Sequence, residues 1–431
     1  MTDTALPTPQ LSGRQWLIAA ALGLAVAAFH FFHGIPLAKT VLLQSFNWMF
    51  DFDSSRFVGG WCTPGANVVE DINIGFAPRH ALSLATRPLC LGLNALIGNP
   101  YVALMALTAL CAGAAVAIAY LLVASFCAAE FDRILLALGF AVSAQPLMMG
   151  VIPETYGFAL AGVGLHLMLV ARKRPAPLGA GPAGVISLFL DLGVTLTNGA
   201  LNLLSSIVQS WQRMGLRQWL RMELRTWLWA VLALALVVVP LAALYTPTLL
   251  QEAGTAPKHV WWVININRGE PATLAEVIRA FLVYNFVGPA YSVYPLPAPE
   301  SHPMLDFRAL NFGLAGALAA ALWVLALCCS VYLALRKGGV QRYLWILLGW
   351  LLINIVLHWY WQYRGSVYLY GAHNCFALFG IGVLGYAIAV RERYAVVARS
   401  AAVVMIGLAA VNNIGLYLEM IDFLRRQPLA P

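Results

Sequence analysis

Long apolar runs separated by short basic clusters constrain this chain more than any other feature. Of the 431 residues, 61% are hydrophobic and only 10% are charged. A helix needs about 20 apolar residues to cross a bilayer, and in lipid its backbone groups must be satisfied within the segment. The runs are continuous and rich in leucine and alanine, whereas a barrel strand alternates apolar and polar residues. We therefore predict an all-α fold, a polytopic transmembrane helical bundle in a single domain of residues 1–431.

The apolar runs predict about eleven membrane segments. Two stretches, 184–194 and 200–210, are too short to cross about 30 Å at about 1.5 Å per residue. We predict that they form a pair of partial-depth helices meeting at residues 195–199. The remaining segments are predicted at residues 15–36, 101–126, 134–150, 156–170, 227–245, 311–335, 344–361, 367–390 and 401–418.

The distribution of positive charge predicts the orientation. Basic residues gather at 172–174, along Arg213, Arg217, Arg221 and Arg225, and at 336–342. Short cytoplasmic loops carry such an excess of lysine and arginine. Residues 37–99 and 246–308 then become outer loops, and the arginine stripe is expected on the anionic inner leaflet. Arginines at 425–426 break the pattern, so one miscounted span stays an open alternative.

The net charge and the cysteine pattern limit which partners, metal sites and disulfides are expected. The net charge of +8 lies in short loop clusters, so we predict no nucleic-acid partner. The seven cysteines show no metal-ligand spacing, and His30 and His33 lack an evident third ligand, so we predict no metal site and interpret both histidines as interfacial. A disulfide between Cys62 and Cys90 is one alternative, if both face an oxidising compartment.

Unusual polar residues collect on the predicted outer side. Mixed carboxylates and cations beside apolar helices are typical of a cleft for an amphiphile. A transporter would instead hold ionisable groups near the bilayer midplane. Asp191 is the one candidate for such a buried charge, and a polar residue hydrogen-bonded inside the bundle is the simpler interpretation.

Five motifs follow one another in order on this face. They are F-D-F-D-S-S-R at 50–56, R-H-A-L at 79–82, P-E-T-Y at 153–156, T-N-G at 197–199 and R-G-S-V-Y-L-Y-G-A-H-N at 364–374. The second motif opens residues 78–98, predicted to be an interfacial helix rather than a span. The order resembles the GT-C superfamily of polyprenyl-phosphate-dependent glycosyltransferases, although alanine replaces the usual proline in the second motif. The chain lacks the large soluble carboxy-terminal domain of the oligosaccharyltransferases, which favours transfer of a single sugar.

The resemblance implies an aspartate general base in the first outer loop. A carboxylate can accept the proton of an attacking hydroxyl, and we assign this role to Asp53, with Asp51 in reserve. Arginines suit the leaving phosphate because they form paired hydrogen bonds. The predicted substrate-binding residues are Arg56, Arg79, His80, Glu154, Asn198, Arg268, His302, Arg364 and His373.

The implied partners are a polyprenyl-phosphate-linked sugar and a glycan, lipid or protein acceptor, met within the membrane lipid. We expect the bacterial inner membrane, with the active site facing the periplasm. A need for a divalent cation stays open. An O-antigen polymerase or ligase, with an arginine-led site, and a lipid-linked sugar transporter or flippase, dependent on Asp191, are the alternative functions.

Overall fold

The computed structural model describes residues 11–43, 49–50, 57–64, 83–173, 178–179, 181–210, 214–245, 272–295, 303–307, 310–361 and 367–427. Within these ranges, eight helices are long and apolar enough to cross a membrane. They are α1 (Gly13–Gly34), α5 (Pro100–Ala124), α8 (Thr155–Lys173), α11 (Leu216–Tyr245), α15 (Leu314–Arg336), α16 (Gln341–Trp361), α18 (Ala372–Arg391) and α19 (Ala395–Arg426). The predicted helical membrane bundle is confirmed.

Shorter elements complete the bundle. The short helices are α4 (Ser83–Ile97), α6 (Glu130–Ala141), α7 (Ala144–Met149), α9 (Pro182–Val194), α10 (Gly199–Ser210), α14 (Leu274–Arg279) and α17 (Val367–Tyr370). Short 3₁₀ helices are η1 (Ile35–Lys39), η2 (Val41–Leu43), η4 (Leu196–Asn198) and η7 (Gly338–Val340), and short π-helices are η3 (Val58–Cys62) and η6 (Ala280–Tyr284). Among the described residues, β1 (Ser292–Pro295) and β2 (Pro303–Asp306) form a short antiparallel pair beside the helices.

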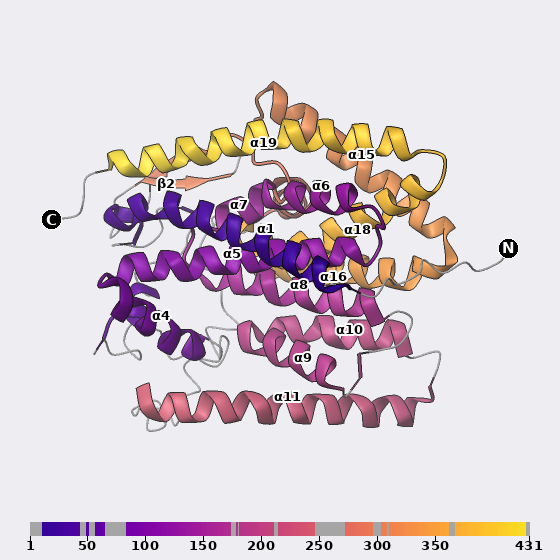
Figure 1. Ribbon diagram of the computed structural model, residues 1–431, viewed down its shortest axis with the longest axis horizontal. Helices are drawn as coiled ribbons and strands as arrows, with labels where there is room; N and C mark the ends of the chain where they lie inside the picture. Colours follow the sequence, from indigo (N-terminus) through magenta and orange to yellow (C-terminus); the bar gives the residue numbers. More distant parts are fainter. Residues whose placement is uncertain are drawn as a thin grey trace.

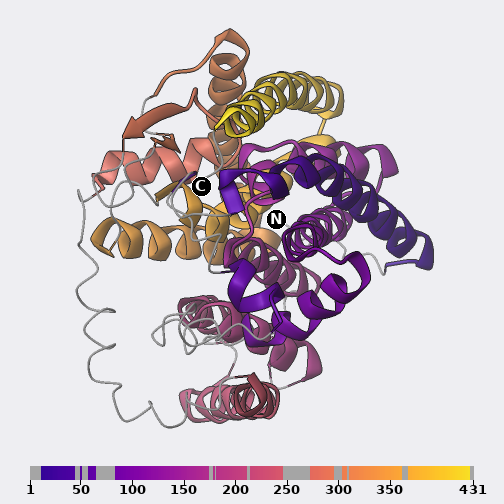
Figure 2. The same cartoon turned by 90° about the vertical axis from the view of Figure 1, so that its left-hand side faces the viewer.

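The helices run side by side along the long axis of the molecule (Figure 1). We call the end where α1 begins the basic end, because arginines lie there on α6, α11, α15, α18 and α19. The strands β1 and β2, helix α4 and the last turns of α19 lie at the opposite end, which faces the viewer in Figure 2. Because α19 runs unbroken between the two ends, Arg425 and Arg426 belong to the opposite end.

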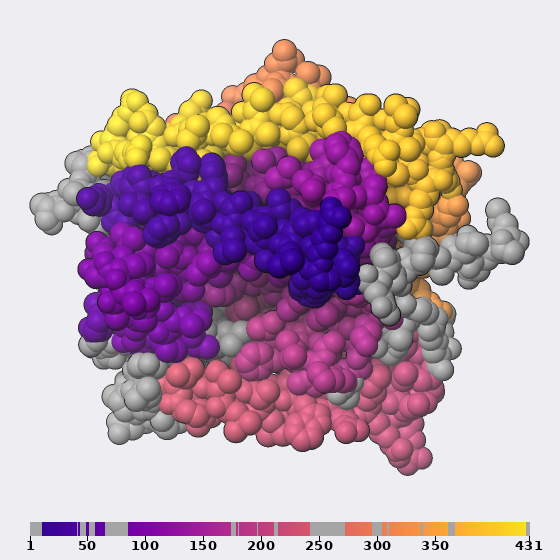
Figure 3. Space-filling view, in the orientation of Figure 1, coloured from indigo at the N-terminus to yellow at the C-terminus, as the bar shows by residue number. Residues whose placement is uncertain are grey.

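Helices α1 and α5 pack closely because small residues face each other. The buried face of α1 includes Ala19, Gly23 and Ala27, at spacings of four. A Cβ added to Gly23 would lie 2.7 Å from the Gly113 carbonyl oxygen. Small residues let backbones approach in this way inside membranes. Figure 3 shows α1 lying across one face, with α19 along one edge and α11 along the other.

Replacing Gly113 with leucine is expected to lower the free energy of unfolding by about 3 kcal/mol, because the new side chain would overpack this crossing. Leucine at Gly407 of α19 is the matched control, because an added Cβ there meets no atom within 4 Å. Thermal unfolding in detergent measures both variants. Equal midpoints for the two would contradict the close packing of α1 on α5.

The segment predicted as one span over 134–150 is in fact two helices, α6 and α7. Pro146 has no N–H to donate to the carbonyl oxygen of Val142, four residues earlier. Asn413 of α19 donates to that oxygen instead, at 2.8 Å. The N–H groups of Ala144 and Gln145 donate to the carbonyls of Phe286 and Asn285. The break is therefore satisfied by protein groups, as the membrane interior requires.

The region predicted as a partial-depth pair is α9 and α10, joined by η4 at residues 196–198. The arginine stripe differs from its prediction as a separate element. Arg217, Arg221 and Arg225 begin the same continuous helix, α11, that continues through residues 227–245. The predicted span over 367–390 is also divided, into α17 and α18, at Gly371.

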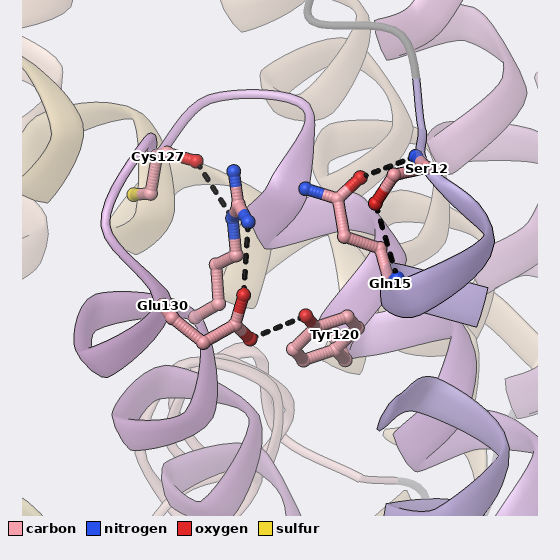
Figure 4. A network of polar contacts seen from close by, with 6 residues as sticks. Ser12, Gln15, Tyr120, Cys127 and Glu130 are labelled. Carbon is pink, nitrogen blue, oxygen red and sulfur yellow. Dashed lines mark hydrogen bonds and ion pairs between the residues drawn. The ribbon is translucent and has the colours of Figure 1, made fainter. Parts of the chain in front are cut away.

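Polar contacts tie the helices together at the basic end (Figure 4). Ser12 and Gln15 cap α1 reciprocally. Arg133 donates to the carbonyl of Cys127 and pairs with Glu130 at 3.0 Å. Nearby, buried Asp132 accepts hydrogen bonds from Arg399 of α19 and Tyr386 of α18. These contacts fix α6 against the last two spans.

The opposite end contains the disulfide that the sequence left open. Cys62 of η3 is bonded to Cys90 of α4. Buried Arg87 adds hydrogen bonds from α4 to the carbonyls of Gly60 and Thr63. The residues predicted as an interfacial helix are helical over Ser83–Ile97. Since disulfides persist in oxidising compartments, this bond supports an outer location for this end.

A labelling experiment tests that location. In spheroplasts, Cys62 and Cys90 should resist a membrane-impermeant maleimide and react only after an impermeant reductant is added, because both sulfurs are engaged in a disulfide on the outer side of the membrane. A Cys62→Ser, Cys90→Ser variant is the background control. Labelling that appears only after permeabilisation would put this end inside the cell.

Candidate functional site

Three predicted site residues lie among the described residues: Glu154, Asn198 and His373. The other predicted site residues lie outside the described ranges. They are Asp51, Asp53, Arg56, Arg79, His80, Arg268, His302 and Arg364. The structure therefore describes only part of the site. The catalytic role of its two aspartates stays a prediction.

Asn198 and His373 meet although they are 175 positions apart. The Asn198 Oδ1 atom lies 2.9 Å from His373 Nδ1, and both residues are buried. Asn198 ends η4, at the turn of the partial-depth pair, and His373 lies in the first turn of α18. The partial-depth pair therefore delivers a polar side chain to the start of a span.

Aromatic side chains surround this pair. The Tyr370 ring is stacked on His373 at 6.3 Å between centroids, and Tyr156 meets His373 edge-on at 6.1 Å. His358 of α16 lies 4.4 Å from the Tyr370 ring. Such a frame of amphipathic rings offers flat apolar faces together with hydrogen-bonding edges.

Glu154 precedes α8 and lies near the same frame through its neighbour Tyr156. Its carboxylate accepts from the Thr155 backbone N–H at 3.1 Å and from the Thr155 hydroxyl at 3.3 Å. A carboxylate at a helix N-terminus is stabilised by the helix dipole. This position gives Glu154 a structural role at the start of α8, and a contact with substrate stays a prediction.

A second group of polar side chains surrounds Gly371, between α17 and α18. We call this group and the Asn198–His373 pair the polar layers. A Cβ at this glycine would lie 3.1 Å from Asn285 Oδ1 and 3.2 Å from Gln145 Oε1. Those two acceptors, the Asn374 amide and the Tyr368 hydroxyl are buried without a hydrogen-bond partner among the described residues. Buried polar groups usually have partners, because an unmet one costs about 1–3 kcal/mol. The layer therefore offers donors and acceptors to a polar ligand.

The described residues on either side of the predicted catalytic segment 51–56 are firmly packed. Phe50, just before Asp51, packs on Tyr368 of α17 at 4.5 Å and on Phe307 at 4.8 Å. Its backbone has a φ of 50°, unusual for a bulky residue, and its N–H donates to the Leu305 carbonyl of β2. Phe57, just after Arg56, packs on Trp61. Trp61 in turn meets Phe158 of α8.

A small recess next to Tyr368 contains residues that the sequence reasoning missed. Its volume is about 10 Å³, and Glu276, Arg279, Tyr284 and Asp306 help to line it. Burial raises the pKa of Tyr284, so its phenol is protonated and can donate at neutral pH. In the sequence, Asp306 falls within the predicted outer loop 246–308. Nothing in the local pattern distinguished it from the other polar residues of that loop.

The sequence singled out Asp191 but not the buried polar residues around it. Asp191 Oδ2 lies 3.1 Å from His166 Nδ1, and both side chains are fully buried. The other ring nitrogen of His166 lies 2.9 Å from the Ser205 hydroxyl. The cluster joins α8, α9 and α10 and places Asp191 against a polar partner inside the bundle. That Asp191 is held there by hydrogen bonds stays a prediction, because neither carboxylate oxygen has a hydrogen-bond partner among the described residues. A histidine in the apolar run 156–170 was the available signal.

His30 differs from its interpretation as an interfacial residue. It is buried, and a Cβ on Gly150 would contact its ring at 2.4 Å. Across the ranges that the structure describes, no group of three or more histidine, cysteine, aspartate or glutamate side chains could hold a metal ion.

The arrangement can bind an amphiphile's polar part through buried amides, imidazoles and phenols beside apolar spans. Comparisons of the chain with protein-family models, with curated proteins and with solved structures found no match.

Proposed function

We propose that this chain is a membrane glycosyltransferase of GT-C type. It transfers a single sugar from a polyprenyl-phosphate donor to a lipid-linked glycan, lipopolysaccharide or protein acceptor. The reaction takes place at the periplasmic face of a bacterial inner membrane. On this account the chain has about eleven membrane segments, counting the α9–α10 pair and the divided spans.

One observation carries the proposal. The two residues that flank the D-F-D-S-S-R segment are packed on the elements that form the polar layers. Phe50 contacts Tyr368, five residues before His373, and Phe57 is connected through Trp61 to Phe158, two residues after Tyr156. On this ground we propose that the aspartates of the segment between these two flanks act at the polar layers.

The proposed chemistry assigns each polar group a role. Asp53 accepts the proton of the acceptor hydroxyl as its oxygen bonds to the anomeric carbon. The bond from that carbon to the phosphate oxygen breaks, and the polyprenyl phosphate leaves with the electron pair. Arg279 joins Arg79, Arg268 and Arg364 as a candidate cation for the departing phosphate. Asn198 and His373 bind sugar hydroxyls beside the stacked Tyr370 ring.

Reconstitution tests the proposal. The full chain in vesicles, given polyprenyl-phosphate-linked hexose or pentose and a short lipid-linked glycan, should release polyprenyl phosphate and lengthen the glycan by one sugar. Both products should appear in equal amounts. Polyprenyl phosphate released without a lengthened glycan would indicate hydrolysis, and no release from any donor would remove the assignment.

The buried Asp191–His166 pair favours transport of a lipid-linked sugar as a second candidate. Ionisable residues inside a membrane bundle frequently mark a transport pathway. In sealed vesicles, the transport account predicts that labelled lipid-linked sugar changes leaflet without forming a glycosidic bond, and that Asp191→Asn stops this while Asp53→Asn does not. We expect the reverse: Asp53→Asn stops glycosidic bond formation, and Asp191→Asn keeps it once the folded fractions are matched.

A further inference from the structure

An apolar groove opens between α15 and α19, near the basic end and away from the polar layers. Its volume is about 520 Å³, within the usual range for ligand sites. We call it the α15–α19 groove; its lining includes Trp323, Tyr332, Gly382, Tyr386, Tyr394 and Met405. Leu325 and Val397, also in its lining, are 59% and 68% exposed. The groove is therefore accessible from the surroundings of the bundle.

The depth of the groove matches one leaflet of a bilayer. At its inner limit, Trp323 stacks on Phe286 at 4.3 Å and donates its indole N–H to the Leu282 carbonyl. Tyr332 lies nine residues further along α15, which is about 14 Å of helix. That length is about half of a hydrocarbon core of about 30 Å. A single hydrocarbon chain that enters near Tyr332 would reach Trp323 near the middle of the membrane.

The lining of the groove is apolar and does not suit a polar ligand. Tyr386 donates its hydroxyl to Asp132, so its ring is the part left for the groove. Small residues, among them Gly382 and Ala326, leave the space open. A Cβ at Gly382 would meet Trp323 only at 3.4 Å, an ordinary contact. The space is therefore not closed by the packing of the two helices.

The charged residues at the mouth of the groove favour a ligand with an anionic headgroup. Two basic side chains there are neutralised: Lys337 pairs with Glu392, and Arg399 pairs with Asp132. Arg336 lies with its guanidinium 4.7 Å from the centre of the Tyr332 ring and has no carboxylate partner among the described residues. An uncompensated arginine beside an apolar groove attracts an anionic headgroup on a hydrocarbon chain.

We propose that the α15–α19 groove is a binding site for an anionic phospholipid. One of its hydrocarbon chains fills the groove from Tyr332 to Trp323, and its phosphate lies against Arg336 at the basic end. The site is distinct from the proposed sugar-transfer site. Helix α18 contributes to both, with His373 in its first turn and with Gly382 and Tyr386 further along in the groove.

Native mass spectrometry tests this site. The full chain is released from vesicles of equimolar phosphatidylglycerol and phosphatidylcholine, and the lipids that stay bound are counted. We expect one phosphatidylglycerol to be retained in preference to phosphatidylcholine. Arg336→Gln should lower that preference about fivefold, the effect of about 1 kcal/mol per basic residue. Arg225→Gln removes an exposed arginine from α11, outside the groove, and should leave the preference unchanged.

Variants that fill the groove provide a second test of the proposal. Gly382→Leu should abolish retention of that lipid at an unchanged unfolding midpoint, and Ala326→Leu serves if the first variant does not fold. Equal retention of both lipids by the wild-type chain, or retention unaffected by the filling variants, would overturn the proposal. A dimer held together through this groove would also overturn it, because a second copy would then be the occupant.

Discussion

Replacing Asp53 with asparagine is expected to lower sugar transfer by about 1,000-fold, because an amide cannot accept the proton of the acceptor hydroxyl. General-base catalysis commonly contributes about 100- to 10,000-fold. The substitution conserves size, so the unfolding midpoint should be unchanged. Transfer is measured in vesicles as the rate at which labelled polyprenyl-phosphate-linked sugar elongates the acceptor.

Asp51→Asn is the matched control, two residues away in the same segment. We expect it to retain most of the activity, because Asp53 is assigned as the base. The opposite pattern, with Asp53→Asn active and Asp51→Asn inactive, would transfer the role to Asp51. Activity that survives the loss of both aspartates would instead favour an arginine-led polymerase or ligase.

The second large effect is expected at the contact between Asn198 and His373. Each side chain is buried and partners the other, so Asn198→Ala or His373→Ala leaves a polar atom unmatched at a cost of about 2 kcal/mol. If that cost falls on the bound sugar, transfer drops about 30-fold in either variant. A double variant should be little worse than each single one, since both remove the same interaction.

Two measurements separate a role in binding from one in folding. Asn202→Ala, four residues later in the first turn of α10, is the control for removal of a buried asparagine amide. Thermal unfolding should change no more in Asn198→Ala than in this control, whereas the transfer rate should separate them. Additive losses in the double variant would contradict a shared role for Asn198 and His373.

The sequence predicted most of the helices because hydrocarbon thickness and backbone hydrogen bonding leave few alternatives. The turn between α9 and α10 falls within the residues expected for it, since two short apolar stretches can be recognised by length alone. The arginine stripe was separated from the following span because charge dominates a local pattern. In the structure, the helix α11 continues through both.

The missed features depend on residues far apart in the chain. Pro146 lies in the segment predicted as one span over 134–150, and the compensating donor, Asn413, is 267 positions away, so nothing local identifies it. His166 and Asp191 were each visible as polar residues in apolar surroundings, while their contact depends on how α8 packs on α9. Asp306 lies in a hairpin whose register sets which side chains meet Tyr368. Partners of this kind follow from tertiary packing, which periodicity does not encode.

Mass spectrometry of lipid-linked glycans and envelope polysaccharide most directly tests the central claim of sugar transfer. It compares cells that make this protein with cells that lack it and with cells that carry only Asp53→Asn. The account predicts that one hexose or pentose mass is lost from the same glycan in both altered strains. An unchanged glycan profile in the strain without the protein would contradict it.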